Sequence, residues 1–422
     1  MKAFSAPTIR AVTRRRVAKL PFVRDTRLPR SRCLATQAGE AGNLNSPPAI
    51  GFAPLTDRKL IAIAGVDATK FLQGLITASI YKPGAPSPEE PRDEGFYTAF
   101  LTAQGRVLHD VFIHPNPQLH GIAEAQRKGL VPEHSFLIEV ADSQVNALYT
   151  LIRRYKLRSK FTHNKVNQED LVVYSYWNET LSDPPGTPEG LASYGKEAHI
   201  TRDSRAPDLG WRVLATGQQE LRADAEECGL STYKVRRMLR GVPEGPDEIV
   251  PDKTLPLDAN IDLMGGIDFR KGCYVGQELT IRTKHRGVVR KRILPCMIYG
   301  EDEQIPQELV YRSIPGDGIV AANVPTKTEI GLVGGNKTRR TANWIAGIGN
   351  IGLAMCRLQP MTDIELPGES ADAPSPYDPS QEFMLKLGPS SEGSAGKILK
   401  VRPFVPDWMR ERLAQSVNHN RT

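Results

Sequence analysis

The sequence predicts an α+β fold that ends in a small β-barrel or sandwich. Before about Arg290, apolar residues recur at helical spacing in some segments and as short strand-like runs in others. After Arg290 the pattern consists of short strands separated by Gly and Pro, which is typical of a small barrel or sandwich. The apolar share of 40% and the charged share of 24% fit a globular chain, and 422 residues are enough for two or three domains.

The first expected elements are a strand and a helix. Leu60–Ala64 is predicted to be a buried strand, and Asp67 is predicted to cap a helix with an apolar face from Phe71 to Ile80. The next expected elements, in chain order, are strands at Phe96–Leu101 and Val107–Ile113 joined by a hairpin turn at Thr102–Gly105, a strand at Ser135–Val140, a helix capped by Asp142 that continues into Arg153–Lys156, a strand at Leu171–Tyr176, a loop and strand within Thr201–Leu214, and helices at about 217–228 and 231–240.

We place a domain boundary near Arg290, between an α+β region of two interleaved lobes at 50–290 and a β region at 291–410. The strands expected after the boundary are Lys291–Tyr299, Glu308–Arg312, Trp344–Arg357 and Ile398–Phe404. Two segments are expected to be insertions. Residues 82–95, rich in Pro and acids, are predicted to form a surface loop, and residues 366–396, rich in Ser, Pro, Gly and acids, are predicted to be disordered.

The first 39 residues differ in charge from the rest of the chain. They hold ten Lys or Arg and one acid, Asp25, which leaves 45 basic against 47 acidic residues in the remainder. The net charge of +7 therefore comes from this leader, and the nearly neutral remainder does not support a nucleic-acid binder. An Arg-rich leader with few acids and no apolar core is typical of a mitochondrial transit peptide, although a basic nucleic-acid-binding arm is the alternative. We expect 1–39 to be a transit peptide and the protein to work in the mitochondrial matrix. No run of about 18 apolar residues occurs, so no membrane span is expected.

The stretch Lys271–Glu278 (Lys-Gly-Cys-Tyr-Val-Gly-Gln-Glu) has the features of a functional site. Cys273 stands in a glycine-containing, polar stretch with cations on both sides, whereas structural cysteines are usually set among aliphatic residues. Nearby cations favour the thiolate, which is the form of cysteine that attacks electrophiles and binds metals. We therefore favour a functional Cys273 over a buried structural thiol. Cys33 lies in the leader, and the contexts of Cys228, Cys296 and Cys356 are typical of structural thiols.

No second ligand or base accompanies this cysteine in the sequence. There is no CxxC motif, and His109 and His114 lack a third ligand of suitable spacing. Iron–sulfur clusters need about four ligands, so Cys273 could provide one ligand to a cluster shared with a partner or act as a covalent nucleophile. Gly347–Gly352 matches a GxGxxG pattern formally, but it lies among predicted strands and not before a helix, which favours a glycine-containing strand.

The stretch Lys271–Glu278 resembles the signature of the YgfZ-like folate-binding family, relatives of the glycine-cleavage T-protein (aminomethyltransferase). The resemblance covers roughly residues 55–300, with a weaker echo at Arg402–Trp408. The other matching segments, in the same order as in the family, are Gly65–Leu75, Ala99–Arg106, Tyr155–Arg158, Asp203–Arg205, Tyr233–Gly245 and Leu255–Asn260.

The resemblance implies a three-lobed fold around a central, folate-sized opening, with a C-terminal barrel. The family's mitochondrial member acts late in making 4Fe–4S clusters for aconitase-like and radical-SAM enzymes, with A-type scaffold proteins as partners. Its signature cysteine is the residue expected to meet the cluster, and its fungal members have been described under the name of a transferase. The chain departs from the T-protein at His109-Asp110, where the T-protein has paired aspartates, and at Leu239 or Arg240, where it has a glutamate that grips folate. Asp110 is left as a pterin contact.

Our leading hypothesis is a non-catalytic or weakly catalytic assembly factor in which Cys273 ligates an iron–sulfur cluster shared with an A-type scaffold. Lys271 and Arg282 would keep the sulfur as thiolate, Gly272 and Gly276 would shape the loop, and Gln277 and Glu278 would brace it. The alternative is a tetrahydrofolate-dependent one-carbon transferase. The residues predicted to form the site are Cys273 as metal ligand, together with Lys271, Gly272, Tyr274, Gly276, Gln277, Glu278, Arg282 and Asp110.

Overall fold

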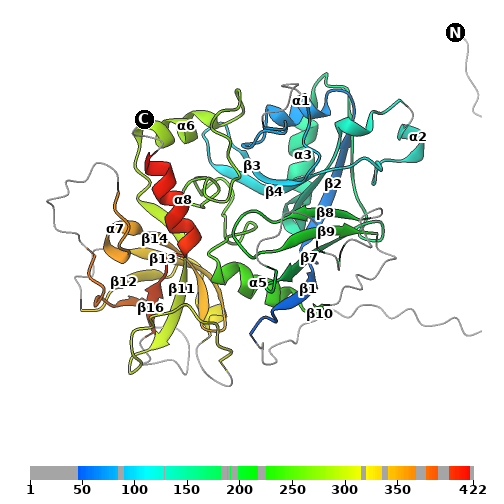
Figure 1. The fold of residues 1–422 in the computed structure, drawn as a ribbon. Coiled ribbons are helices and arrows are strands. Elements are labelled where there is room, and N and C mark those ends of the chain that lie inside the picture. Colours follow the sequence, from blue (N-terminus) through cyan, green and yellow to red (C-terminus); the bar gives the residue numbers. More distant parts are fainter. Residues whose placement is uncertain are drawn as a thin grey trace, which may run out of the picture. The chain divides into compact units, whose positions relative to one another are not determined.

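A computed structural model describes residues 46–83, 90–127, 129–181, 188, 191, 198–216, 225–314, 320–334, 341–366, 377–387 and 399–418. All of them belong to one compact unit, Asn43–Thr422. The unit contains two five-stranded sheets, a closed six-stranded barrel and several helices, so the predicted α+β class with a C-terminal barrel is confirmed (Figure 1). The predicted transit peptide lies outside the described residues.

One sheet carries the helices that position the candidate site. Its strand order is β3-β4-β5-β2-β6, and all its neighbours are antiparallel. Its strands are β2 (Arg58–Ala64), β3 (Phe96–Leu101), β4 (Val107–Pro115), β5 (Ser135–Ala141) and β6 (Thr162–Lys165). Side chains alternate along β2, so that Ile61 and Ile63 pack with α1 and α3, whereas Leu60 and Ala62 pack toward the second sheet.

The second sheet has the order β10-β1-β7-β9-β8, in which only the pairing of β1 with β10 is parallel. Its strands are β1 (Ile50–Pro54), β7 (Val172–Asn178), β8 (His199–Arg202), β9 (Trp211–Ala215) and β10 (Glu226–Glu227). The prediction of a helix over 217–228 is wrong for residues 225–228, the part that the structure describes. Glu226 and Glu227 pair with β1 as a strand, and Gly229 caps the following helix and does not end a preceding one.

The barrel closes because its last strand returns to its first, in the order β11-β14-β13-β12-β15-β16. Its strands are β11 (Lys291–Gly300), β12 (Glu329–Leu332), β13 (Ala342–Ile348), β14 (Ile351–Arg357), β15 (Phe383–Leu385) and β16 (Leu399–Pro403). The GxGxxG match is the tip of the β13–β14 hairpin, where Gly349 has φ +57°. The match thus lies among strands and not before a helix, as expected, but the single strand predicted at Trp344–Arg357 is two strands joined by a turn.

Two further sequence predictions for the barrel region need correction. Residues 308–312 form no strand. The stretch 366–396 was predicted to be disordered, but Phe383–Leu385 within it forms β15, which pairs with β12 and β16. The pairing is explained by the apolar Phe383 and Leu385, which are both buried in the barrel although polar residues dominate the surrounding sequence. Most of the rest of 366–396 lies outside the described residues.

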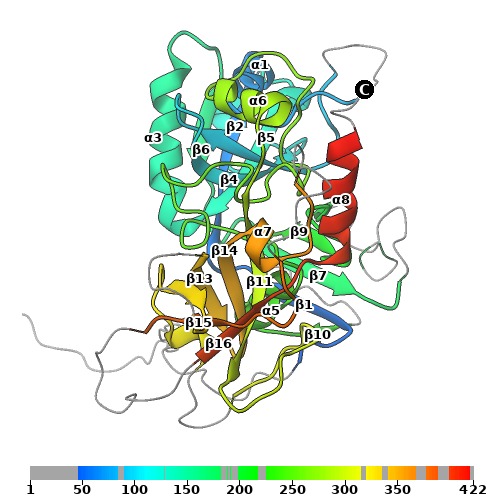
Figure 2. The ribbon, with the colours of Figure 1, turned by 90° about the vertical axis from the view of Figure 1, so that its left-hand side faces the viewer.

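The longer helices pack on the sheets and the barrel. They are α1 (Ala68–Gln73), α3 (Val145–Lys156), α5 (Leu230–Leu239), α6 (Gln277–Arg286) and α8 (Asp407–Asn418). Short turns complete the set: α2 (Glu124–Arg127), α7 (Leu358–Met361) and 3-10 turns at Pro132–His134, Asp142–Gln144 and Ala321–Asn323. The helices α1 and α6 are drawn together at the upper end of Figure 2.

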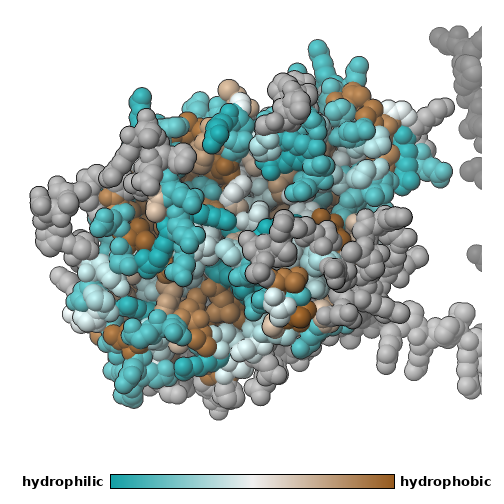
Figure 3. All heavy atoms as spheres, viewed as in Figure 1, coloured by the Kyte–Doolittle hydropathy of each residue, from teal (hydrophilic) through white to brown (hydrophobic). Residues whose placement is uncertain are grey.

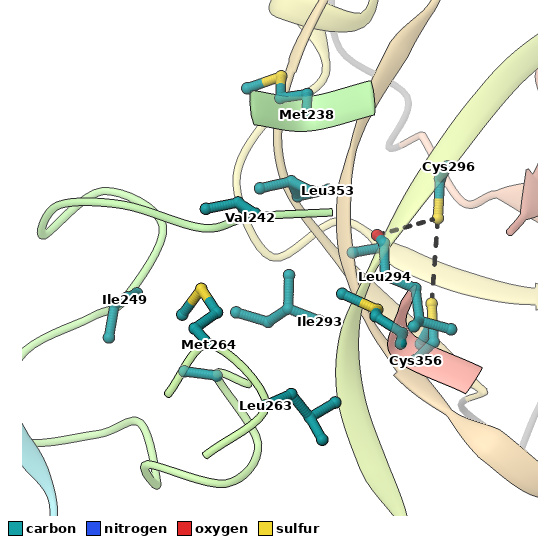
Figure 4. Packing of buried hydrophobic residues seen from close by; sticks show 14 of the residues in the cluster. Met238, Val242, Ile249, Leu263, Met264, Ile293, Leu294, Cys296, Leu353 and Cys356 are labelled. Atoms are coloured by element: carbon teal, nitrogen blue, oxygen red, sulfur yellow. Dashed lines mark hydrogen bonds between the residues drawn. The ribbon is translucent and has the colours of Figure 1, made fainter. Parts of the chain in front are cut away.

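A continuous core connects the barrel to the α+β region. Met238 of α5, Val242, Ile249 and Met264 pack against Ile293 of β11 and neighbouring barrel residues (Figure 4). The face drawn in Figure 3 is mostly hydrophilic, and its hydrophobic residues gather mainly over the barrel. Burial of this apolar area is the main favourable contribution to holding the barrel on the rest of the unit.

Candidate functional site at Cys273

Cys273 is exposed on a loop that ends at the first residue of α6. It is the one exposed thiol in the described part of the chain, because Cys228 is half-buried and Cys296 and Cys356 are buried in the barrel. The loop is held at its edges by two backbone hydrogen bonds: Asp268 N–H donates to Thr77 O (3.0 Å), and Val275 N–H donates to Gly74 O (3.1 Å). The thiol therefore lies next to the carboxyl end of α1.

The side chain of Lys271 holds this loop against the end of α1. Its Nζ donates to three backbone carbonyls at the end of α1 and just after it, those of Gln73 (2.8 Å), Ile76 (2.6 Å) and Ala78 (3.0 Å). The ammonium also lies 5.0 Å from the ring centroid of Tyr274, whose side chain is buried. Burial lowers the pKa of Lys271 to about 7, while nearby Asp268 acts in the opposite direction.

This arrangement gives Lys271 a structural role that was not predicted from the sequence. An ammonium group has three N–H donors, and all three are used by the carbonyls, so none is left for the thiolate of Cys273. Arg282, the other cation assigned to this role, is exposed on α6, and no hydrogen bond or ion pair joins it to Cys273 among the described residues. Lys271 therefore holds the loop that carries the thiol in position, and its effect on the thiolate stays a prediction.

Gly276 and Gln277 set the turn that leads into α6. Gly276 is the N-cap residue with φ +81°, and a Cβ added there would lie 2.2 Å from Thr102 O, in the turn between β3 and β4. Gln277 Oε1 accepts a hydrogen bond from Tyr274 N–H (3.2 Å), which closes the turn across its base. Gly272 has open space around its Cα, and Glu278 is exposed without a hydrogen bond among the described side chains, so neither shapes the loop.

Asp110 lies in the interior and not in the Cys273 loop. It is 5% exposed in the middle of β4, and both of its carboxylate oxygens lie 3.2 Å from Gly245 N–H. Burial raises the pKa of Asp110, Arg58 opposes this shift, and Glu244 adds to it. Tyr97 on the neighbouring strand is buried, and its hydroxyl has no hydrogen-bond partner among the described residues.

Around Asp110 lies a buried cluster of arginines and carboxylates that was not predicted from the sequence. Arg212 and Arg205 both bind Glu244, at 2.5 and 2.7 Å, and Tyr233 donates to the same carboxylate at 2.8 Å. The other members are Arg58, Glu139, Asp203, Arg237 and Glu248. Asp203 and Arg205 stand in one segment that matched the family, and Tyr233, Arg237 and Glu244 stand in another, Tyr233–Gly245. Of the residues opposite the glutamate position of the T-protein, Leu239 packs on the core and Arg240 binds Glu179.

No resident metal site is visible in the described residues. They contain no group of three or more His, Cys, Asp or Glu side chains that could hold a metal ion. His114 contacts Glu139 (3.3 Å) and Thr201 (3.1 Å), and burial lowers the pKa of His109 to about 4, which keeps that imidazole neutral. Within the same residues, no helix is both long and apolar enough to cross a membrane.

Comparison with solved structures shows the fold. The aminomethyltransferase T of the glycine cleavage system from Bartonella henselae superposes with a TM-score of 0.53, covering 85% of each chain at 14% sequence identity. At that identity the likeness concerns the fold alone, and it agrees with the T-protein-like architecture predicted from the sequence. No protein-family model matches the chain.

Comparison with curated proteins finds relatives along nearly the whole chain. The iron–sulfur cluster assembly factor IBA57 homolog, mitochondrial, of Chaetomium globosum is 40% identical over 90% of this chain and 89% of its own length. The proteins of the same name from Pyricularia oryzae and Neurospora crassa are 44% and 43% identical, over 87% and 86% of this chain and 87% and 81% of their own lengths. The chain therefore belongs to the family of mitochondrial iron–sulfur cluster assembly factors known as IBA57 homologues.

Proposed function

We propose that the protein is a mitochondrial iron–sulfur cluster assembly factor in which Cys273 provides one ligand to a cluster shared with an A-type scaffold protein. The observation that carries this proposal is the exposure of Cys273 on a loop held by Lys271 and Gly276, in a described structure that contains no group of three or more potential metal ligands. A single exposed thiolate can complete the coordination of a cluster held by another protein, but it cannot hold one alone. The clusters made in this way would be of the 4Fe–4S type, for aconitase-like and radical-SAM enzymes in the matrix.

The pinned loop suits a transient ligand. A ligand on a loop that is fixed at both ends reaches the metal with little loss of conformational freedom, so the shared cluster can form without folding of the loop. The absence of an N–H donor from Lys271 leaves the sulfur lone pairs free for iron. Solvent access permits the cluster to leave when the complex separates.

The decisive experiment is anaerobic mixing of the full chain with an A-type scaffold carrying its cluster. We expect the wild type and a Cys228→Ser control to form a complex that retains iron and visible absorbance during size-exclusion chromatography. Cys273→Ser should lose the cluster-containing complex. An equally stable cluster-containing complex with Cys273→Ser would refute the role of ligand.

The second candidate is a tetrahydrofolate-dependent function at Asp110. The observation that favours it is the pair of buried groups at this position: a carboxylate that can accept hydrogen bonds from a pterin edge, and the unpartnered hydroxyl of Tyr97. A carboxylate acceptor and a free hydroxyl are the groups that would pair with the polar edge of a pterin, and tetrahydrofolate would supply one-carbon chemistry when bound. Asp110 and Tyr97 would orient the ring, and the closed arginine–carboxylate cluster would exclude water beside it.

Titration calorimetry with tetrahydrofolate tests this candidate. We expect Asp110→Asn to weaken binding about tenfold, while the exposed Asp142→Asn leaves it unchanged. A methylene-transfer assay on the wild type then separates the two functions. Turnover would establish a transferase, and absence of binding would remove folate from this site.

A further inference from the structure

The segment between α3 and β6 presents an exposed leucine among five cations. We refer to Arg153, Arg154, Lys156, Leu157, Arg158 and Lys160 as the α3 basic turn. Leu157 is 88% exposed, and Arg153, Arg154, Arg158 and Lys160 are exposed around it. None of the five cations forms an ion pair among the described residues.

The backbone of Leu157 has a conformation that costs conformational free energy in a residue with a Cβ atom. It is the C-cap residue of α3 with φ +42° and ψ −109°, a conformation that side chains other than glycine rarely adopt. Glycine or asparagine is the usual residue at such a helix end. The Leu157 side chain is thus exposed to water, and its backbone conformation costs free energy. Residues in sparsely populated backbone conformations are found more often at binding sites than elsewhere.

The turn is fixed in place and does not hang free. Asp67 Oδ2 accepts a hydrogen bond from Lys160 N–H (2.6 Å), Ser159 N–H donates to Lys156 O (2.8 Å), and the Lys156 ammonium lies 5.1 Å from the ring centroid of Phe161. Cations in the last turn of a helix are favoured by the helix dipole, which accounts for Arg153, Arg154 and Lys156. It does not account for Arg158, Lys160 or the exposed leucine.

The turn and the Cys273 loop lie at the two ends of the same short helix. Asp67, which binds Lys160, immediately precedes α1, and Gly74, which binds Val275, immediately follows it. Six residues of α-helix are only roughly 9 Å long, so one protein surface can reach both. Figures 1 and 2 both draw α1 and α6 at the upper end of the molecule. Further exposed cations on this end are Lys70, Arg270, Arg282 and Arg286.

We propose that the α3 basic turn is a docking surface for an acidic protein face with an apolar depression that receives Leu157. This inference rests on the proposed function, because the partner is the one that shares a cluster with Cys273. Charge complementarity supports it: without the first 39 residues the chain carries slightly more acids than bases, so these cations are a local concentration and not a general excess. A membrane is the less suitable occupant, because it would turn Cys273 at the other end of α1 toward lipid.

Binding kinetics with a cluster-free A-type scaffold provide the test. We expect the association rate of the full-length wild type to fall steeply as salt increases. Arg154→Glu/Arg158→Glu should lower the association rate about tenfold and remove most of its salt dependence. The matched control, Lys327→Glu/Arg357→Glu, reverses two exposed cations at the barrel and should change the rate less than about twofold.

Leu157→Gly separates binding from folding. Glycine tolerates φ +42°, so the midpoint of denaturation should not fall, while loss of the apolar side chain should raise the dissociation rate about tenfold. Wild-type kinetics for both the arginine pair and Leu157→Gly would overturn the inference. A second outcome would also overturn it. In that outcome the wild type binds cardiolipin-containing vesicles at about 150 mM salt, and Arg154→Glu/Arg158→Glu loses this vesicle binding but keeps scaffold binding.

The variant Cys273→Ser tests docking separately from cluster ligation, the function on which this inference rests. We expect it to retain the salt-dependent encounter with the cluster-free scaffold, because the cations are unchanged. Suppose instead that Cys273→Ser keeps a stable cluster-containing complex, whereas Arg154→Glu/Arg158→Glu associates slowly with the scaffold. The role of Cys273 as a ligand is then refuted, and the docking surface is supported.

Discussion

The two glycines near Cys273, Gly272 and Gly276, differ in whether their positions can accept a side chain. At Gly276, φ is +81° and an added Cβ would lie 2.2 Å from a backbone oxygen, whereas the space around Gly272 is open. We therefore expect Gly276→Ala to lower the free energy of unfolding by about 1–3 kcal/mol, and Gly272→Ala to change it by less than about 0.5 kcal/mol. Urea denaturation of the two variants checks this. Equal effects would mean that the turn at Gly276 relaxes easily.

Lys271 should make stability depend on pH in a defined direction. Its pKa in the folded chain is lowered by burial from an ordinary value near 10.5 to about 7, so between these values the unfolded chain binds a proton that the folded chain does not. Stability therefore rises with pH from about 7 to about 10 through this residue. We expect the difference in stability between the wild type and Lys271→Met to grow in favour of the wild type over this range. Denaturation at several pH values measures it, and a constant difference would contradict the lowered pKa.

At this scale the sequence singled out Cys273 as the candidate site residue but did not show which contacts hold its loop. Cys273 could be found because its polar, glycine-flanked context is unlike that of the other cysteines. The acceptors of Lys271 are backbone carbonyls of residues 73–78, almost 200 positions earlier. A pattern of side chains does not show which backbone carbonyls lie nearby. The sequence therefore predicted an interaction of Lys271 with Cys273 alone.

Among the elements, β15 gives the clearest case of a short strand with a structural role. Phe383 is 1% exposed in the barrel, whereas Leu387, just beyond the strand, is 38% exposed. We expect Phe383→Ala to cost about 3–5 kcal/mol and Leu387→Ala less than about 1 kcal/mol. Thermal or urea unfolding followed by tryptophan fluorescence reports the difference. A small effect of Phe383→Ala would show that β15 is dispensable for closing the barrel.

The elements that the sequence predicted well are those with long apolar patterns, such as β2, β5 and α3. The helix α6 was missed because Leu279 and Ile281 are its only aliphatic side chains, which is too few to show a helical period. It forms where Gly276 ends the loop and where Leu279 packs against Gly105 of the β3–β4 turn. Tertiary packing, which no local pattern contains, decides such elements.

For the whole molecule, the buried arginine–carboxylate cluster ties the two sheets together. Glu139 of β5 binds Arg58 at 2.8 Å and lies 3.5 Å from Arg212 of the other sheet. Glu139→Gln removes the carboxylate that Arg58 binds and one of the carboxylates near Arg212, so we expect a loss of about 3–5 kcal/mol at neutral pH. The exposed pair of Lys82 and Glu90 is the control, and Glu90→Gln should cost less than about 1 kcal/mol.

The same cluster sets the response to acid. Burial would raise the pKa of Glu139, but Arg212 and Arg58 outweigh it and lower the pKa to about 2. A carboxyl group with a lowered pKa stabilises the fold above its ordinary value near 4.5, and this stabilisation is lost as pH falls toward 2. Glu139→Gln should therefore lose less stability than the wild type between these values. Denaturation across this range measures the effect, and parallel curves would contradict it.

The helix α8 has a consequence for how the chain is completed. Trp408 Nε1 donates to Arg240 O at 3.0 Å, and Arg412 donates to the carbonyls of Arg205 and Leu263. Three segments made much earlier in synthesis thus receive hydrogen-bond donors only when these late residues emerge from the ribosome. A message with a premature stop codon near position 400 would yield a polypeptide with nearly all its strands but with those carbonyls uncovered. Such a product would be recognised by proteases in preference to the finished protein.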